Sequence, residues 1–247
     1  KTEPISVKDN DPIEEVAEKI EKYDLVALPV VDSIGRLVGR ITIDDVIDEI
    51  REQHERDYQL ASGISQDIEA SDKVYMQTAA RLPWLLIGMA GGLANSILLG
   101  GFDSLFAANP KMALFIPLIG GTGGNVGIQS SAIVVQGLAN NSLKQAKLWS
   151  LIAKEVVVAL INASIISLVV FLFNYFFLGD VLVMSAVSIS LFSVVLFASI
   201  FGTMVPMLLD RLKIDPAIAT GPFITITNDL IGMMIYMLVA TLLAQAL

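Results

Sequence analysis

The sequence has no cysteine and one histidine, His54, so disulfide bonds and thiolate metal sites are excluded. With no second histidine to pair with, His54 is expected to be an exposed side chain rather than a metal ligand. A phosphate-binding loop or ATPase motif is also missing, which argues against an ATP-driven pump. What remains for metal chemistry is oxygen: carboxylates, amides, hydroxyls and backbone carbonyls.

Charge is almost missing from residues 82–247, which hold six basic and six acidic side chains. Residues 1–81 hold 10 basic and 19 acidic side chains, so they carry the whole net charge of −9. The chain as a whole is 54% hydrophobic with a mean hydropathy of +0.68, well above an ordinary soluble domain. An acidic soluble part therefore precedes an apolar one. Residues 1–24 are charged throughout and predict no cleavable signal peptide, and a first residue other than Met predicts a piece of a longer chain.

Long apolar runs define the second part of the chain. About 20 apolar residues are enough to cross a bilayer as a helix. Five runs qualify, near 82–100, 112–138, 148–178, 181–209 and 215–246. The sequence therefore predicts an α-helical membrane protein with five transmembrane helices, 82–247, preceded by a small soluble segment.

Basic residues near the ends of these runs indicate the orientation. One side would carry Arg81, Lys144, Lys147, Lys154, Arg211 and Lys213, and the other only Lys111. The excess predicts a multi-pass protein of the plasma membrane with a cytoplasmic N-terminus and an extracytoplasmic C-terminus.

The acidic part reads as a small α/β unit, residues 1–56. Apolar residues at helical spacing predict a helix over 12–22, and a second helix is expected over 44–58. Between them, "LVALPVVD" and "LVGRITI" predict two strands joined by the turn "SIGR". A polar linker, 57–81, is expected to be helical over about 65–80 and to lead into the first span.

The run "PLIGGTGGNVGIQSSAIVVQGLA", Pro117–Ala139, is unusually small and polar for a membrane segment. Its glycines permit close backbone approach, and irregular backbone at membrane depth is tolerated only in buried protein or beside water. We therefore expect carbonyls of Gly120, Gly121 and Gly124, with the amides of Asn125 and Gln129, to line a polar path. The alternative is that the glycines only let helices pack, as expected for Gly88 and Gly92 in the first run.

Asp229 is the one carboxylate expected deep inside the membrane. An ionisable residue there is costly, by about 2.5–3.5 kcal/mol or more, and usually marks an ion pathway. Nearby Thr225, Thr227 and Asn228 add oxygen ligands, and Asp215 and Glu155 at span ends complete the candidate set. The alternative is a protonated or hydrogen-bonded Asp229 inside the bundle.

Three stretches carry a resemblance to known families. Residues 5–50, "ISVKDNDPIEEVAEKIEKYDLVALPVVDSIGRLVGRITIDDVIDEI", resemble one CBS motif. "PLIGGTGGNVGIQSSAIVVQGLA" and "DPAIATGPFITITNDLIGMMIYM" resemble the second and fifth membrane helices of the MgtE magnesium transporters, whose order of parts is the same. The resemblance implies a homodimer with a pore on the two-fold axis, which would bring two copies of Asp229 together.

The resemblance also implies roles for the acidic part. Asp44, Asp45, Asp48 and Glu49 would sense Mg²⁺ and help to close the pore, although a merely solvated helix face is the alternative. Thr42 and Asp45 match the ribose-contacting turn of CBS motifs, so a nucleotide partner is a further expectation; nucleic acid is not.

We therefore predict a Mg²⁺ channel or transporter, with Mg²⁺ as its ion, and not an enzyme. Transport of Ca²⁺, Mn²⁺ or Co²⁺ remains open, because hard oxygen ligands do not separate these ions firmly. An intramembrane enzyme using Asp229 and a CBS-bearing sensor that moves no ion are the less favoured alternatives.

Overall fold

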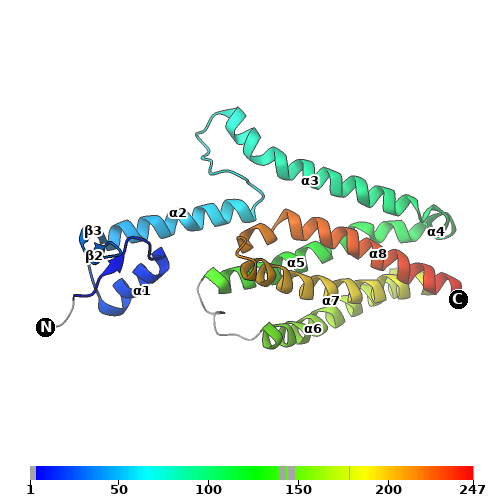
Figure 1. Cartoon of the computed structure of the whole chain (residues 1–247). Helices are drawn as coiled ribbons and strands as arrows, with labels where there is room; N and C mark the ends of the chain where they lie inside the picture. The colour runs from blue at the N-terminus through cyan, green and yellow to red at the C-terminus, as the bar shows by residue number, and fades with distance from the viewer. Residues whose placement is uncertain (1–3, 140–142, 144–147, 178, 247) are drawn as a thin grey trace. The chain divides into compact units, whose positions relative to one another are not determined.

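The computed structural model describes residues 4–139, 143, 148–177 and 179–246 (Figure 1). It divides into two compact units, residues 1–58 and 59–247.

The first unit contains a three-stranded sheet and two helices, the second of which extends past Tyr58. Its elements are β1 (Val7–Lys8), α1 (Ile13–Tyr23), β2 (Ala27–Val31), β3 (Leu37–Thr42) and α2 (Ile43–Ala61). β1 pairs in parallel with β2, which pairs antiparallel with β3. A small core of Val7, Val16, Ile20, Leu28 and Val46 holds the helices on the sheet. The predicted helices and hairpin are confirmed.

The predicted helix over 65–80 is wrong for its first nine residues. After α2 the chain turns at Gly63, whose φ of 77° is left-handed, and residues 64–73 form no helix. The segment is held by tertiary hydrogen bonds instead. The backbone N–H and the hydroxyl of Ser65 both donate to the carbonyl of Ala80 at 2.9 Å, and the Gln59 amide bonds to the backbone of Ile68.

The second unit is helical. Its elements are α3 (Val74–Gly100), α4 (Asp103–Ala108), the 3₁₀ turn η1 (Pro110–Phe115), α5 (Ile116–Ala139), α6 (Leu148–Phe177), α7 (Val181–Arg211), the 3₁₀ turn η2 (Pro216–Ala219) and α8 (Pro222–Ala246). The five long helices alternate in direction, so the start of α3 and the end of α8 lie at opposite ends of this unit (Figure 1).

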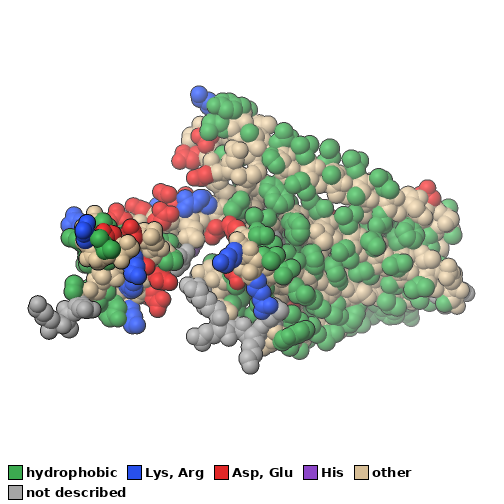
Figure 2. Space-filling view, in the orientation of Figure 1, with side chains coloured by type: hydrophobic (Ala, Val, Ile, Leu, Met, Phe, Trp, Pro, Cys, Tyr) green, Lys and Arg blue, Asp and Glu red, His purple; other side chains and the backbone are tan. Residues whose placement is uncertain are grey.

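Among the described residues, four helices are long and apolar enough to cross a membrane: α3, α6, α7 and α8. α5 has the length, but its glycines and polar residues keep it below the same hydropathy. The sequence prediction of five such helices is therefore supported for four. Hydrophobic side chains cover most of the visible face of this unit, and charged ones gather mainly at the end where α3 begins (Figure 2).

α7 supplies much of the buried core of the second unit. Its Val183, Val187, Leu191 and Val194 are fully buried. They belong to one cluster with buried residues of η1, α5 and α8: Met112, Phe115, Ile119, Met233, Tyr236, Met237 and Ala240. Because α7 packs against α5, α6 and α8, the positions of these three helices depend on it.

The basic residues used for orientation are placed at helix ends. Arg81 lies near the start of α3, Lys154 near the start of α6, and Arg211 at the end of α7. These ends share one side of the alternating helices, and Lys111 in η1 lies on the other, with its Nζ 3.7 Å from an Asp180 carboxylate oxygen. Lys144 and Lys147 lie outside the described residues.

Candidate cation site

The glycine-rich run forms one continuous helix, α5 (Ile116–Ala139). The irregular backbone predicted for it is therefore wrong. Inside an α-helix each carbonyl accepts the N–H four residues on, so these carbonyls are already engaged in the helix. The glycines act instead through the side chains they lack.

One face of α5 uses its glycines for packing. A Cβ on Gly123 would lie 2.9 Å from Val194 Cγ1 of α7, and a Cβ on Gly127 would overlap the Asn228 amide of α8. A Cβ on Gly202 of α7 would lie only 2.5 Å from the Gly127 carbonyl oxygen. On this face the glycines therefore let α5 pack closely against α7 and α8, which is the alternative that the sequence left open.

In α3 the packing glycine is not one of the two that the sequence suggested. A Cβ on Gly91 would overlap Cγ2 of Ile226 in α8. Apart from the nearby backbone of α3 itself, no heavy atom of the described chain lies within 4 Å of such a Cβ on Gly88 or Gly92. The helix therefore meets α8 through the glycine between them.

Another face of α5 leaves space beside a carboxylate. A Cβ on Gly120 would lie 3.3 Å from Asp229 Oδ1, and one on Gly124 would lie 3.7 Å from it. The Gly124 position would also lie 3.3 Å from Cγ2 of Thr225. Side chains at these glycines would crowd Asp229.

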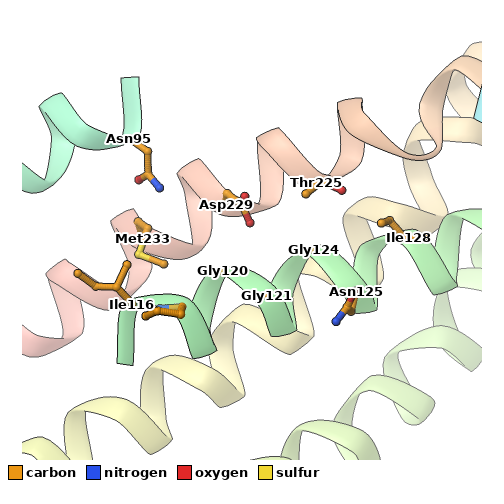
Figure 3. A pocket seen from close by; sticks show the side chains of 11 residues that line it. Asn95, Ile116, Gly120, Gly121, Gly124, Asn125, Ile128, Thr225, Asp229 and Met233 are labelled. Carbon is orange, nitrogen blue, oxygen red and sulfur yellow. The ribbon is translucent and has the colours of Figure 1, made fainter. Parts of the chain in front are cut away.

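A cavity of about 300 Å³ lies where these residues meet (Figure 3). Its lining comes from α3, α5 and α8: Asn95, Ile116, Pro117, Gly120, Gly121, Gly124, Asn125, Ile128, Thr225, Asp229 and Met233. Figure 3 shows the Asp229 side chain directed from α8 toward the glycines of α5. Asp229 is the one charged residue of this lining, and the side chains of Asn95, Asn125 and Thr225 add neutral oxygens.

Asn95 of α3 belongs to this lining although the sequence prediction did not include it. Its Oδ1 is buried and has no hydrogen-bond partner in the described part of the chain. An amide inside the apolar run "GGLANSILLG" was the available signal, because a polar residue in a membrane helix usually has a function. The sequence could not show that α3 faces Asp229.

Five other candidates lie outside the cavity. The Thr227 hydroxyl donates to the carbonyl of Phe223 in its own helix at 2.9 Å. Gln129 is exposed. Asn228 is 1% exposed and packs against Gly127, and neither of its amide atoms has a partner among the described residues. Asp215 caps η2, since its Oδ1 accepts the N–H of Ala217 at 2.8 Å. Glu155 of α6 accepts hydrogen bonds from two serines instead.

The acidic candidates of the first unit are all on the surface of α2. Asp44, Asp45, Asp48 and Glu49 are exposed. Glu49 accepts a hydrogen bond from Arg56 at 3.1 Å, so part of the negative charge is balanced within α2.

Thr42 and Asp45 bond to each other and cap α2. The Thr42 hydroxyl and backbone N–H donate to Asp45 Oδ2 at 2.6 and 2.9 Å. Asp45 N–H lies 3.4 Å from the Thr42 hydroxyl, the reciprocal arrangement of a capping box. These bonds lower the pKa of Asp45 below its usual range.

Comparisons with known proteins identify the family of the chain. A family model described as "MgtE: Divalent cation transporter" matches residues 116–239, and the CBS domain model matches residues 1–52. The chain is 34% identical to the magnesium transporter MgtE of Bacillus subtilis over 234 residues, 34% to that of Enterococcus faecalis over 238, and 35% to that of Thermus thermophilus over 239. These alignments cover 94–96% of this chain and 52% of each relative.

The fold and the comparisons therefore define a multi-pass membrane protein of the divalent cation transporter class with an N-terminal CBS domain. The chain belongs to the MgtE family, as the resemblance indicated. Its family is one of transporters, not enzymes, as predicted. The chain spans about half the length of the curated relatives it matches.

Proposed function

We propose that this chain forms the ion path of a Mg²⁺ channel in the plasma membrane, with Asp229 as its principal cation ligand. The observation that carries the proposal is the lone carboxylate beside Gly120 and Gly124, in a cavity whose other polar groups are neutral oxygens. The names of the relatives, all magnesium transporters, support the choice of ion.

The size and chemistry of the cavity suit a hydrated Mg²⁺. This ion dehydrates reluctantly and typically binds through one or two carboxylates while it keeps several waters. At about 30 Å³ for each water, a cavity of about 300 Å³ has the volume of roughly ten waters. Asn95, Asn125 and Thr225 would then hold the water shell, while Asp229 supplies the charge.

A single carboxylate is little charge for a divalent ion, so the proposal includes a homodimer. Two copies of Asp229 at one two-fold axis supply two negative charges. In this arrangement α5 is the fifth membrane-spanning helix. Its polar face lines the path, which explains why it is less apolar than the other four. The excess of basic residues at one end supports a cytoplasmic N-terminus and an extracytoplasmic C-terminus.

We also propose that the acidic surface of α2 senses Mg²⁺ and regulates the path. Asp44, Asp48 and Glu49 are exposed, and a divalent ion would relieve their mutual repulsion. A nucleotide at Thr42 and Asp45 is less favoured, because those two side chains already bond to each other.

Transport of Ca²⁺, Mn²⁺ or Co²⁺ is the second candidate, favoured by the all-oxygen character of the cavity. A sensor that moves no ion would need no path, so a flux measurement separates it from both transport hypotheses. Competition between Mg²⁺ and each other ion in the same assay decides the selectivity.

The test is Asp229→Asn, which keeps the size of the side chain and removes its charge. We expect the dimer to form and most Mg²⁺ binding and flux to be lost, as measured by calorimetry and by uptake into proteoliposomes from one preparation. Asp103→Asn, at an exposed position of α4, is the matched control and should retain both Mg²⁺ binding and flux. Full binding and flux in a folded Asp229→Asn dimer would overturn the proposal.

A further inference from the structure

Glu155, Ser130 and Ser199 form a hydrogen-bonded cluster that joins three helices, here called the three-helix joint. Oε1 of Glu155 in α6 accepts the hydroxyl of Ser130 in α5 at 2.7 Å and the hydroxyl of Ser199 in α7 at 2.5 Å. The two hydroxyl oxygens lie 3.2 Å apart. One carboxylate oxygen therefore connects α5, α6 and α7.

The joint lies next to the closest approach of α5 and α7. A Cβ on Gly202 would lie 2.5 Å from the Gly127 carbonyl oxygen and 3.1 Å from Cβ of Ser130. The two backbones are in contact there, so α5 cannot shift toward α7 without a clash. The hydrogen bonds to Glu155 oppose the reverse movement, because α5 would have to leave the carboxylate.

The geometry does not suit a cation at Glu155. Both serine hydroxyls direct their protons at the same oxygen, at distances typical of charge-assisted hydrogen bonds. Glu155 is absent from the lining of the Asp229 cavity. Within the described residues there is also no group of three or more acidic or histidine side chains that would hold a metal ion.

The same helix that is held by the joint carries the glycines beside Asp229. Ser130 lies on the side of α5 toward α7, whereas Gly120 and Gly124 lie on the side toward Asp229 of α8. Gly127 lies between these two sides: its carbonyl approaches Gly202 of α7, and its Cα faces Asn228 of α8. A rotation or shift of α5 at the joint would therefore change the space beside the carboxylate. That space is set within a few tenths of an ångström, because the Gly120 position lies 3.3 Å from Asp229 Oδ1.

We propose that Glu155 is a positioning residue for transport: it fixes α5 against α6 and α7 through Ser130 and Ser199, and so sets the distance between the glycines of α5 and Asp229. The joint stays closed throughout transport. This inference rests on the proposed function, in which the Asp229 cavity is part of the ion path.

The first test compares two substitutions at one position. Glu155→Gln keeps an oxygen that accepts both serine hydroxyls, whereas Glu155→Ala removes it. We expect Glu155→Ala to lower Mg²⁺ uptake into proteoliposomes about tenfold or more, since a misplacement of about 1 Å can cost that much. Glu155→Gln should keep most of the uptake, and the double variant Ser130→Ala/Ser199→Ala should resemble Glu155→Ala. An equal loss for Gln and Ala would identify Glu155 as a cation ligand and overturn the inference.

The second test restores the connection covalently. The chain has no cysteine, so Ser130→Cys and Ser199→Cys, whose oxygens lie 3.2 Å apart, give one defined disulfide. We expect the Glu155→Ala chain with both cysteines to take up Mg²⁺ slowly when the cysteines are reduced. When they are oxidised, its Mg²⁺ uptake should recover to within about twofold of wild type. A cross-linked chain as slow as its reduced form would overturn the inference.

Hydrogen exchange of α5 separates this inference from the proposed function. Glu155→Ala should increase exchange across residues 116–139, and the disulfide should reverse the increase, whether or not the chain carries ions. If the wild-type chain shows no flux, the proposed function fails, and hydrogen exchange alone decides whether the three-helix joint holds α5 in place. If wild-type flux is normal but neither exchange nor flux responds to Glu155→Ala, only the joint fails.

Discussion

Asp229 Oδ1 lies 3.3 Å from the position that a Cβ would take on Gly120, one helix away. Few real Cβ contacts are that close, so the carboxylate occupies its place because residue 120 has no side chain. The site therefore depends on both residues: Asp229 of α8 supplies the charge, and Gly120 of α5 leaves the space that this carboxylate needs. The two residues come from different parts of the sequence.

Gly120→Ala should therefore reduce Mg²⁺ uptake several-fold with little change in folding. The added methyl group displaces the Asp229 carboxylate or the water beside it, since neither α5 nor α8 has an irregular segment that would absorb the shift. Uptake into proteoliposomes measures the effect. Gly88→Ala in α3 is the control, because its added Cβ would meet no heavy atom of the described chain within 4 Å apart from the nearby backbone of α3 itself. Equal uptake for the two variants would show that the space at Gly120 has no part in transport.

Asn95→Leu should lower Mg²⁺ uptake a few-fold. The buried Oδ1 of Asn95 has no protein partner in the described residues and lines the Asp229 cavity, so we expect it to hold a water of the hydrated ion. Asn174→Leu in α6 is the matched control. Asn174 is also buried without partners in the described part, but it does not line this cavity.

The two asparagine substitutions are expected to differ in outcome. Asn174→Leu should leave uptake unchanged and keep or raise thermal stability, because an apolar group replaces an unpaired buried amide. If Asn95→Leu also leaves uptake unchanged while it raises stability, Asn95 is only an unpaired amide and has no role in the path.

The sequence identifies Asp229, Gly120 and Asn125 because each is unusual for its local surroundings. A carboxylate or an amide in an apolar run costs free energy, and that cost is visible without any knowledge of the fold. The strands and helices of the first unit are likewise local, since they follow from hydrophobic period and turn residues. The structure brings Asp229, Gly120 and Asn125 to one cavity, and it confirms the strands and helices of the first unit.

The remaining features depend on which helix faces which. Asn95 joins the cavity only because α3 packs on α8, and Gln129 misses it although it lies one turn from Asn125. Residues 64–73 form no helix for the same reason, because the Ser65 hydroxyl donates to the Ala80 carbonyl, which is distant in sequence. Glu155 accepts hydrogen bonds from two serines that are 25 and 44 residues away in sequence. Local patterns contain no information about such pairs.

Tyr236→Phe should destabilise the helical unit by about 1–3 kcal/mol. The Tyr236 hydroxyl is fully buried in α8 and donates to the carbonyl of Met112 in η1 at 2.9 Å, so its loss leaves a buried carbonyl without this donor. Thermal unfolding in detergent measures the change. Tyr175→Phe, at a side chain that is 61% exposed, is the matched control and should have no effect. Equal midpoints for wild type and Tyr236→Phe would show that the hydrogen bond contributes nothing to stability.

The capping box of α2 makes a pH-dependent contribution to the stability of the first unit. The Thr42 hydroxyl, the Thr42 backbone N–H and the charge of Arg40, in this order, hold the pKa of Asp45 below its ordinary value of 3.8. A carboxylate whose pKa is lower in the folded state stabilises that state above the unfolded pKa. The contribution is complete above about pH 5 and is lost as the pH falls through the folded pKa, below 3.8.

Thr42→Ala should therefore raise the pKa of Asp45 toward its ordinary value and lower the stability of the first unit at neutral pH. The destabilisation should shrink as the pH falls below 3.8, because protonated Asp45 no longer accepts the bond in either protein. NMR titration of the Asp45 carboxyl and thermal unfolding from pH 2.5 to 7 measure both effects. The pKa of Asp11, which is also lowered, cancels in the comparison because its partners Lys8 and Lys19 are unchanged. Thr42→Ser keeps a hydroxyl and should behave like wild type. A Thr42→Ala destabilisation that is constant across this range would show that Asp45 has no part in the cap.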